Sequence, residues 1–118
     1  MVAQCLSGDD VIKLQTLTRD VVLAPEMATL AATWVRNTHP SGDVSETKNV
    51  VRYGASPRAV QALVLAARAN ALMNGRSWVS REDLQAHVHA VLQHRILMHF
   101  DAVLDGISAK SIVDAVIR

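Results

Sequence analysis

The chain has 118 residues, of which half are hydrophobic and only four are aromatic. This length suits one domain with a core of its own, and an aliphatic core with so few aromatic side chains favours packed helices. Twelve basic and eleven acidic residues give a net charge of +1, which argues against the strongly basic surface of a nucleic-acid-binding or membrane-surface protein.

The first predicted helix begins after Ser7. Ser7 and Asp10 have the spacing of a capping box, in which each side chain accepts a hydrogen bond from the other residue's backbone amide. We therefore expect a helix over about 8–17. Its apolar residues are Val11, Ile12, Leu14 and Leu17.

A short extended run and a second helix come next. Val21–Leu23 is a β-branched run that suits a small two- or three-stranded patch. Pro25 fits the first position of a helix, which we expect to run to about Thr38, because Pro40 disfavours helical geometry in the residue before it. Residues 39–49 are predicted to form a mobile loop that connects this helix to Val50.

The longest predicted helix occupies the middle of the chain. Ser56 suits its N-cap, Pro57 its first position, and Gly75 can adopt the left-handed conformation that ends a helix. Between these residues the segment 60–74 has little polar surface. A helix that is apolar on nearly all sides is expected to be surrounded by the rest of the domain.

Arg58 is unusual within this helix. It stands at the second helical position, where the positive end of the helix dipole makes a carboxylate more usual than a cation. An arginine there adds positive charge beside exposed backbone amides, which favours an anion. Gln61 and Arg68 share its side of the helix, so this side is expected to face something other than the core. A solvated arginine without a function remains the alternative.

The last third of the chain contains two more predicted helices. Trp78–Val79 is a second short extended run, expected to pair with residues 21–23. Ser80 and Asp83 form another capping box, which starts a helix through Leu92 that can extend to Met98. After Phe100–Leu104 and a break at Gly106, Ser108 caps a final helix, whose apolar side carries Ile112, Val113, Val116 and Ile117. The predicted fold is mainly α, a small helical bundle with a minor β patch.

The sequence offers little chemistry of its own. Four histidines lie at 87, 89, 94 and 99, but no pair has the spacing of three or four that a metal site on one helix needs, so we expect no metal site. Cys5 is the only cysteine, which excludes an internal disulfide and suggests a reducing cytoplasm. No phosphate-binding loop and no apolar run ending in paired acids is present, so the chain cannot be a complete ATPase. We also expect no membrane span.

Three stretches together indicate a family. They are Gly-Ala-Ser-Pro-Arg-Ala at 54–59, before an alanine- and leucine-rich helix, Gly-Arg-Ser-Trp-Val-Ser-Arg-Glu-Asp at 75–83, and Val-Leu-Gln-His-Arg at 91–95. At this spacing they resemble the C-terminal lid of MoxR-family AAA+ ATPases, and the likeness spans most of the chain. The chain departs from the family at His39 and Gln93, where the family often carries arginine.

The resemblance implies a role in ATP hydrolysis. In this family the arginine of the Ser-Pro-Arg motif is sensor 2, which reaches the terminal phosphate of ATP bound to the preceding ATPase domain. By resemblance Arg58 is sensor 2, and Gly54, Ala55, Ser56 and Pro57 bring the backbone against the nucleotide. Residues 1–118 would then be a single lid domain without its ATPase core, inactive alone. The full-length protein would use ATP and Mg²⁺.

The resemblance also implies partners. They are the domain's own AAA+ core, neighbouring subunits of a ring that is typically hexameric, and von Willebrand factor A-domain proteins. The ATPase would carry out chaperone-like assembly work. Two other functions stay open from the residues alone. A free-standing adaptor could bind a protein through Trp34 and Trp78, since tryptophan anchors many interfaces, although core placement is expected. A helix-turn-helix module is the other, and the near-neutral charge disfavours it.

Overall fold

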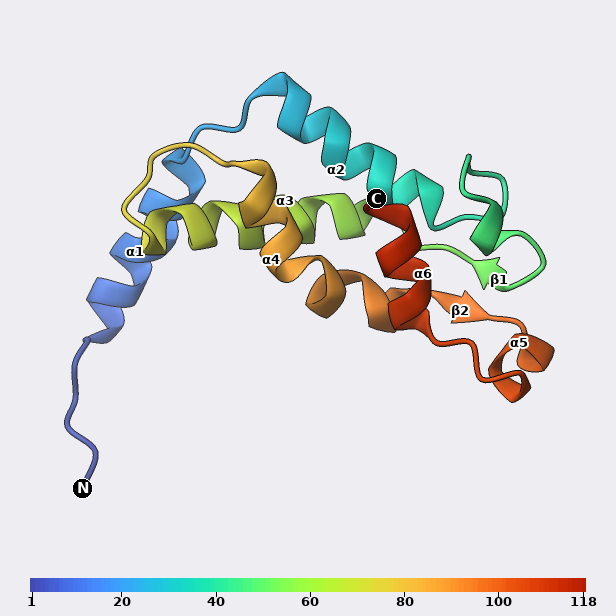
Figure 1. The fold of residues 1–118 in the computed structure, drawn as a ribbon. Helices are drawn as coiled ribbons and strands as arrows, with labels where there is room; N and C mark the ends of the chain where they lie inside the picture. The colour runs from blue at the N-terminus through green and yellow to red at the C-terminus, as the bar shows by residue number, and fades with distance from the viewer.

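A computed structural model describes all 118 residues. The fold is mainly helical, as expected (Figure 1). The elements in chain order are α1 (Gly8–Asp20), α2 (Pro25–Asn37), the 3₁₀ turn η1 (Ser45–Thr47), β1 (Val51–Tyr53), α3 (Pro57–Met73), α4 (Arg81–Leu92), the 3₁₀ turn η2 (Gln93–Arg95), β2 (Leu97–Met98), α5 (Phe100–Leu104) and α6 (Ala109–Val116).

The helix α3 lies at the centre, and α1, α2 and α4 all pack against it (Figure 1). Its buried residues recur every four positions and form one stripe, Ala59, Leu63, Ala67 and Ala71. The prediction that the molecule surrounds this helix is wrong on its outer side, where Leu65 is 48% exposed, and at its end, where Met73 is 86% exposed. Only this stripe is fully buried by the packing of α1, α2 and α4, so the residues of α3 that face away from it stay partly or fully exposed.

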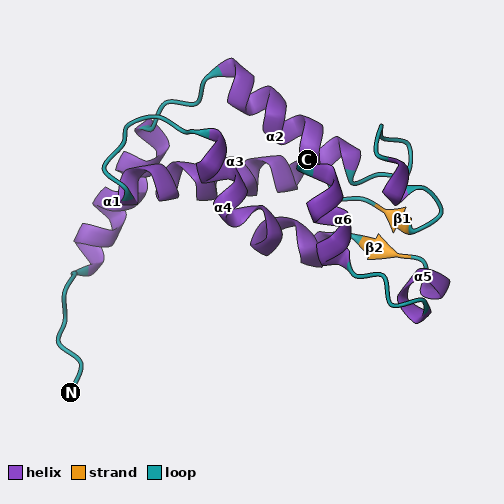
Figure 2. Cartoon of the chain, in the orientation of Figure 1, coloured by secondary structure: helices purple, strands orange, loops and turns teal.

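The first helix buries none of its residues. Its predicted apolar residues all lie on the surface, with exposed fractions between 43% and 61% for Val11, Ile12, Leu14 and Leu17. Figure 2 shows α1 at one end of α3, with the extended N-terminal segment leading away from the body. Packing of an apolar face normally supplies most of the stability of a helix. The apolar residues of α1 lack this packing, so they form an uncovered surface.

Two small patches of β structure connect the helices. The expected pairing of residues 21–23 with 78–79 is present as one parallel bridge between Val22 and Trp78. The Val22 amide donates to the Ser77 carbonyl (2.8 Å), and the Val79 amide donates to the Val22 carbonyl (2.9 Å).

The other patch was not predicted. It is an antiparallel pair of β1 and β2 with an irregular register. The extension of the fourth helix to Met98 is therefore wrong, because α4 ends at Leu92 and the chain passes through η2 into β2. Leu97 and Met98 find backbone partners in β1, so tertiary pairing replaces the next helical turn.

Most helix ends follow the sequence. Both capping boxes form, and the Ser108 hydroxyl accepts from the Ser111 amide (3.2 Å). Gly75 and Gly106 adopt left-handed conformations, with φ of 74° and 80°. The segment 39–49 contains η1, while its mobility stays a prediction.

The tryptophans differ. Trp34 is buried as expected, whereas Trp78 is 56% exposed, so core placement is wrong for the second.

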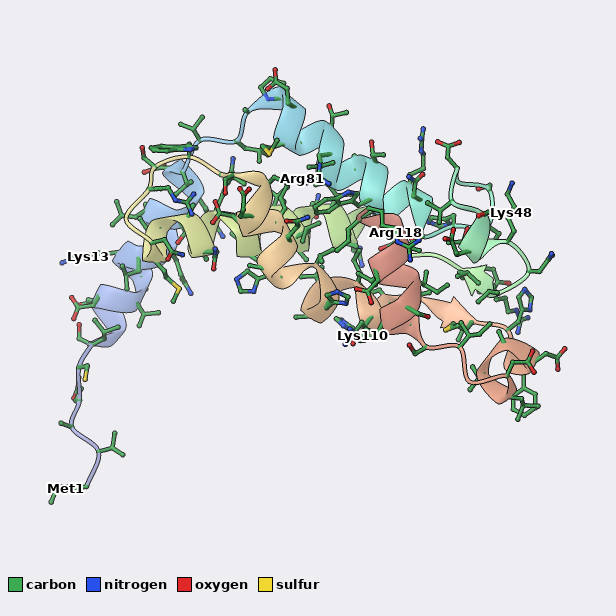
Figure 3. The ribbon with its side chains drawn as sticks, viewed as in Figure 1. Met1, Lys13, Lys48, Arg81, Lys110 and Arg118 are labelled. Atoms are coloured by element: carbon green, nitrogen blue, oxygen red, sulfur yellow. The ribbon has the colours of Figure 1, made fainter.

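The C-terminal helix closes the bundle over α4. Arg118, which is labelled in Figure 3, follows α6. Its guanidinium donates to Glu46 of η1 (3.3 Å). The molecule measures 48 × 40 × 19 Å and is therefore flat. None of its helices combines the length and the hydrophobicity needed to cross a membrane.

Candidate functional site at the start of α3

The Arg58 turn, residues 54–58, leads from β1 into the start of α3 and carries the Ser-Pro-Arg motif. Ser56 has extended backbone angles (φ −75°, ψ 166°), and Pro57 follows as the first helical residue. The predicted N-cap position of Ser56 is confirmed, but its side chain makes no capping hydrogen bond. Only its carbonyl joins the helix, by accepting from the Ala59 amide (2.8 Å). No side chain therefore caps the first turn of α3, in which Pro57 has no amide hydrogen and the Ala59 amide is already paired.

Arg58 lies at the second position of α3, and its side chain is exposed. No ion pair or side-chain hydrogen bond holds its guanidinium. The first turns of α1, α2 and α4 all contain acidic residues, whereas the first turn of α3 contains none. The positive end of the α3 dipole and the charge of Arg58 thus add up without an internal counter-charge, which favours an external anion such as phosphate.

The rest of this side of α3 is mixed. Gln61 is exposed like Arg58, as expected for a side that does not face the core. Arg68 is partly buried, and its Nε atom has no hydrogen-bond partner. The structure thus brings the five motif residues 54–58 together in one turn and leaves Arg68 farther along the same helix.

The end of α2 supports the turn. The Thr38 hydroxyl donates to the Val35 carbonyl (2.6 Å) and accepts from the Ala55 amide (2.8 Å). The His39 Nε2 atom lies 2.8 Å from the Ala55 carbonyl. An open, mainly apolar groove runs beside these contacts, lined by Ala32, Val35, Arg36, His39, Ala55, Pro57 and Val60. No sequence pattern had indicated that Thr38 and His39 would contact this turn.

A second polar cluster joins the far end of α3 to α4. The Asp83 carboxylate is 1% exposed and accepts two hydrogen bonds from the Arg76 guanidinium (2.6 and 2.7 Å). Asn70 donates to it as well (2.7 Å), and so does the Ser80 amide (2.8 Å). These donors, with Arg76 first, hold the pKa of Asp83 far below its ordinary value. The sequence predicted only the capping role of Asp83, so its contacts with Arg76 and Asn70 were missed.

The histidines do not meet. His87 contacts Asn70 (3.2 Å), while His89 contacts Asp114 (3.0 Å) and Gln93 (3.0 Å). No group of three or more His, Cys, Asp or Glu side chains is placed to hold a metal ion. Gln93, where the family pattern differs, therefore bonds within the α4–η2 region rather than at the Arg58 turn.

The comparison with protein families decides between the functions left open. Residues 45–116, which span α3, α4, α6 and the Arg58 turn, match the model of the AAA lid domain. The chain belongs to the AAA lid domain family. This membership does not favour a free-standing adaptor, and the lid has the helical architecture that the motifs predicted.

Relatives agree with this membership. The lid is 30% identical over 117 residues to the protein named Chaperone MoxR1 of Mycobacterium tuberculosis, covering 98% of this chain and 31% of that protein. It is 45% identical over 49 residues to Protein MoxR of Methylorubrum extorquens, covering 42% of this chain and 14% of that protein. The lid is thus similar to a part of proteins named MoxR, and it spans a third or less of these relatives' length.

A solved structure has the same fold. A Cytophaga hutchinsonii protein provisionally named an ATPase superimposes with a TM-score of 0.89 at 27% identity. The superposition covers 93% of this chain and 34% of that protein. The helical architecture described above is therefore that of an AAA+ lid.

Proposed function

We propose that this lid closes over ATP bound to a nucleotide-binding core, and that Arg58 acts as sensor 2. The observation that carries the proposal is an exposed arginine at the second position of α3, free of any internal partner. Its position in the Ser-Pro-Arg motif of an AAA lid gives that free cation a defined target, the terminal phosphate.

The residues of the turn fit the phosphates of a nucleotide and not a metal ion. In this proposal Gly54 to Pro57 bring the backbone against the nucleotide: Ser56 and Pro57 are exposed, while Ala55 is buried and supports the turn through its bonds to Thr38 and His39. Arg58 supplies the only side-chain charge of this stretch. No carboxylate lies in this stretch, so Mg²⁺ would be held by the nucleotide and by the core.

Arg58 has two tasks in this proposal. It offsets the negative charge on the transferring phosphoryl group, and it links the orientation of the lid to the presence of that group. The lid closes while the terminal phosphate holds the guanidinium, and it relaxes when that contact is lost. Pro57 restricts the backbone directly before Arg58, which limits the directions that the side chain can take.

The core would cover the uncovered surface of α1. The relatives are about three times as long as this chain, so a further domain is available to contact the exposed Val11, Ile12, Leu14 and Leu17. A MoxR-type ATPase would act as a ring of subunits with chaperone-like activity, in line with the name Chaperone MoxR1. Von Willebrand factor A-domain partners rest on the family resemblance alone.

The test is Arg58→Ala in the ATPase that carries this lid. Loss of a charge-assisted phosphate contact, about 1.5–3 kcal/mol, should weaken ATP binding about 10- to 100-fold and lower turnover. Binding is measured with a fluorescent ATP analogue, and hydrolysis by phosphate release.

The matched control is Arg52→Ala. Arg52 is also an exposed arginine near the turn, but its guanidinium lies over the Tyr53 ring, 5.4 Å from the ring centre. This variant should bind and hydrolyse ATP as the parent does. Unchanged ATP affinity and turnover in Arg58→Ala would refute the sensor 2 role.

A further inference from the structure

Thr38 and His39, which directly follow α2, form hydrogen bonds with the backbone of Ala55 in the turn before Arg58. The Thr38 hydroxyl accepts from the Ala55 amide, and the His39 ring reaches the Ala55 carbonyl, both at 2.8 Å. A carbonyl can only accept, so His39 must carry its proton on Nε2. Ala55 is fully buried, and these two contacts satisfy both of its backbone polar groups. Without them the groups would be buried unpaired, which is costly.

Gly54 makes this close approach possible. A Cβ atom at Gly54 would lie 2.6 Å from the Thr38 hydroxyl oxygen and 2.6 Å from Cδ2 of the His39 ring. Its φ is not positive, so glycine is required here by the lack of space and not by an unusual backbone conformation. The glycine of the motif therefore lets Thr38 and His39, which directly follow α2, lie against the turn.

His39 is itself held in place. Its amide donates to the Arg36 carbonyl (3.1 Å), and its carbonyl accepts from the Gly42 amide (2.9 Å) and the Thr47 hydroxyl (3.2 Å). The ring thus extends from a backbone that is fixed by α2 and η1. A restrained donor can fix the direction of its acceptor more effectively than a mobile one.

We propose that His39 is a positioning residue for Arg58. By holding the Ala55 carbonyl, His39 sets the direction in which the chain enters α3, and Pro57 transmits that direction to Arg58. This inference rests on the proposed sensor 2 function, because positioning matters only if Arg58 has a ligand. The partner of the ring is the backbone of the turn, so His39 acts without touching the nucleotide.

Two substitutions separate the ring's hydrogen bond from its bulk. In His39→Gln the amide nitrogen can reach the place of Nε2, whereas in His39→Asn the shorter amide reaches only the place of Nδ1. Amide hydrogen exchange on the 118-residue chain reports on the turn directly. We expect His39→Asn to speed exchange of the Ala55 and Ala59 amides by about 3- to 10-fold, the loss of one hydrogen bond. His39→Gln should exchange within about twofold of the parent.

The core amides of Leu63 and Ala67 serve as the internal control. Their exchange should be the same in all three proteins, which shows that the change is confined to the turn. Equal exchange of the Ala55 amide in His39→Asn and in the parent would overturn the proposal that the His39 ring holds the Ala55 carbonyl. Faster exchange of Ala55 together with Leu63 and Ala67 in both variants would also overturn it, since the ring would then support the whole fold.

The link to Arg58 is tested in the longer ATPase. His39→Asn should weaken ATP binding by about 3- to 10-fold, His39→Gln should not, and His39→Asn should add no further loss to Arg58→Ala. If Arg58→Ala lowers affinity and His39→Asn leaves it unchanged, the positioning role is wrong while sensor 2 stands. If Arg58→Ala has no effect, the proposed function fails. The exchange data then still decide whether the His39 ring holds the Ala55 carbonyl.

Discussion

Asp83 is the carboxylate on which the end of α3 and the start of α4 depend. Besides Arg76 and Asn70, it accepts from the amide and the hydroxyl of Ser80, at 2.8 and 3.0 Å. Its side chain is almost fully buried, while that of Arg76 is 28% exposed. A buried charge with this many donors is stable only as long as they remain, because an unpaired buried charge is strongly disfavoured.

Asp83→Asn should destabilise the lid by about 3 kcal/mol, since it removes the charge that Arg76 and the Ser80 amide face. Urea unfolding followed by circular dichroism measures the loss. The matched control is Asp114→Asn, whose carboxylate pairs with His89 on the surface and is 49% exposed, and it should cost less than about 1 kcal/mol. Equal losses in the two variants would show that the Asp83 cluster does not stabilise the fold.

The same cluster predicts a pH dependence. The pKa of Asp83 is lowered from its ordinary 3.8 on folding, so its stabilisation is complete above that value and is lost as pH falls below it. Unfolding free energy should therefore decrease in acid below about pH 4. The decrease should be smaller in Asp83→Asn, which lacks the titrating group.

At the scale of elements, the two C-terminal helices α5 and α6 differ in how many of their residues are buried. In α6 the residues Ile112, Val113, Ala115 and Val116 are buried. In α5 only Ala102 is buried, and Phe100 is 74% exposed. The helix α6 packs into the bundle, whereas α5 extends from it near β2 (Figure 1).

Ile112→Ala should cost about 2–5 kcal/mol, because it opens a cavity against the core at a residue that is 2% exposed. Leu104→Ala in α5 removes a side chain that is 68% exposed and should change stability by less than about 0.5 kcal/mol. Chemical denaturation of both variants measures the difference. A similar loss for Leu104→Ala would mean that α5 packs on the bundle more firmly than its exposure indicates.

At the scale of the whole molecule, stability is concentrated in the middle. The buried residues of α3 and α4 form one core with residues of α2 and α6, while α1 and α5 lie at opposite ends (Figure 1). Elements with few buried contacts open locally at a lower free energy than the core. The molecule is flat, and α1 packs against α3 at one end of it (Figure 1).

Amide hydrogen exchange should reproduce this gradient. In the 118-residue chain, the amides of α1 should exchange well before those of Leu63 and Leu84 in the core. In the ATPase proposed to carry this lid, contact with the nucleotide-binding domain should protect α1. Unchanged exchange of α1 in the longer protein would contradict the proposed contact between α1 and that domain.

Much of the fold could be predicted because it depends on local hydrogen bonds. The caps formed by Ser7 with Asp10 and by Ser80 with Asp83 join residues three apart, so residue type and spacing are sufficient. The same holds for the start of α3 at Pro57 and for the left-handed Gly75. The exposed cation at position 58 was also a local inference, since it follows from the place of Arg58 in its helix.

The amino-acid sequence by itself determined where the helices begin, the helical class and the Arg58 turn. Only the tertiary structure decided which residues meet across the chain: Ala55 with Thr38 and His39, Asp83 with Asn70, and β1 with β2. It also decided that no residue of α1 is buried. The physical reason is that such contacts depend on how the helices pack around α3, and residue type and spacing along the chain do not specify that packing.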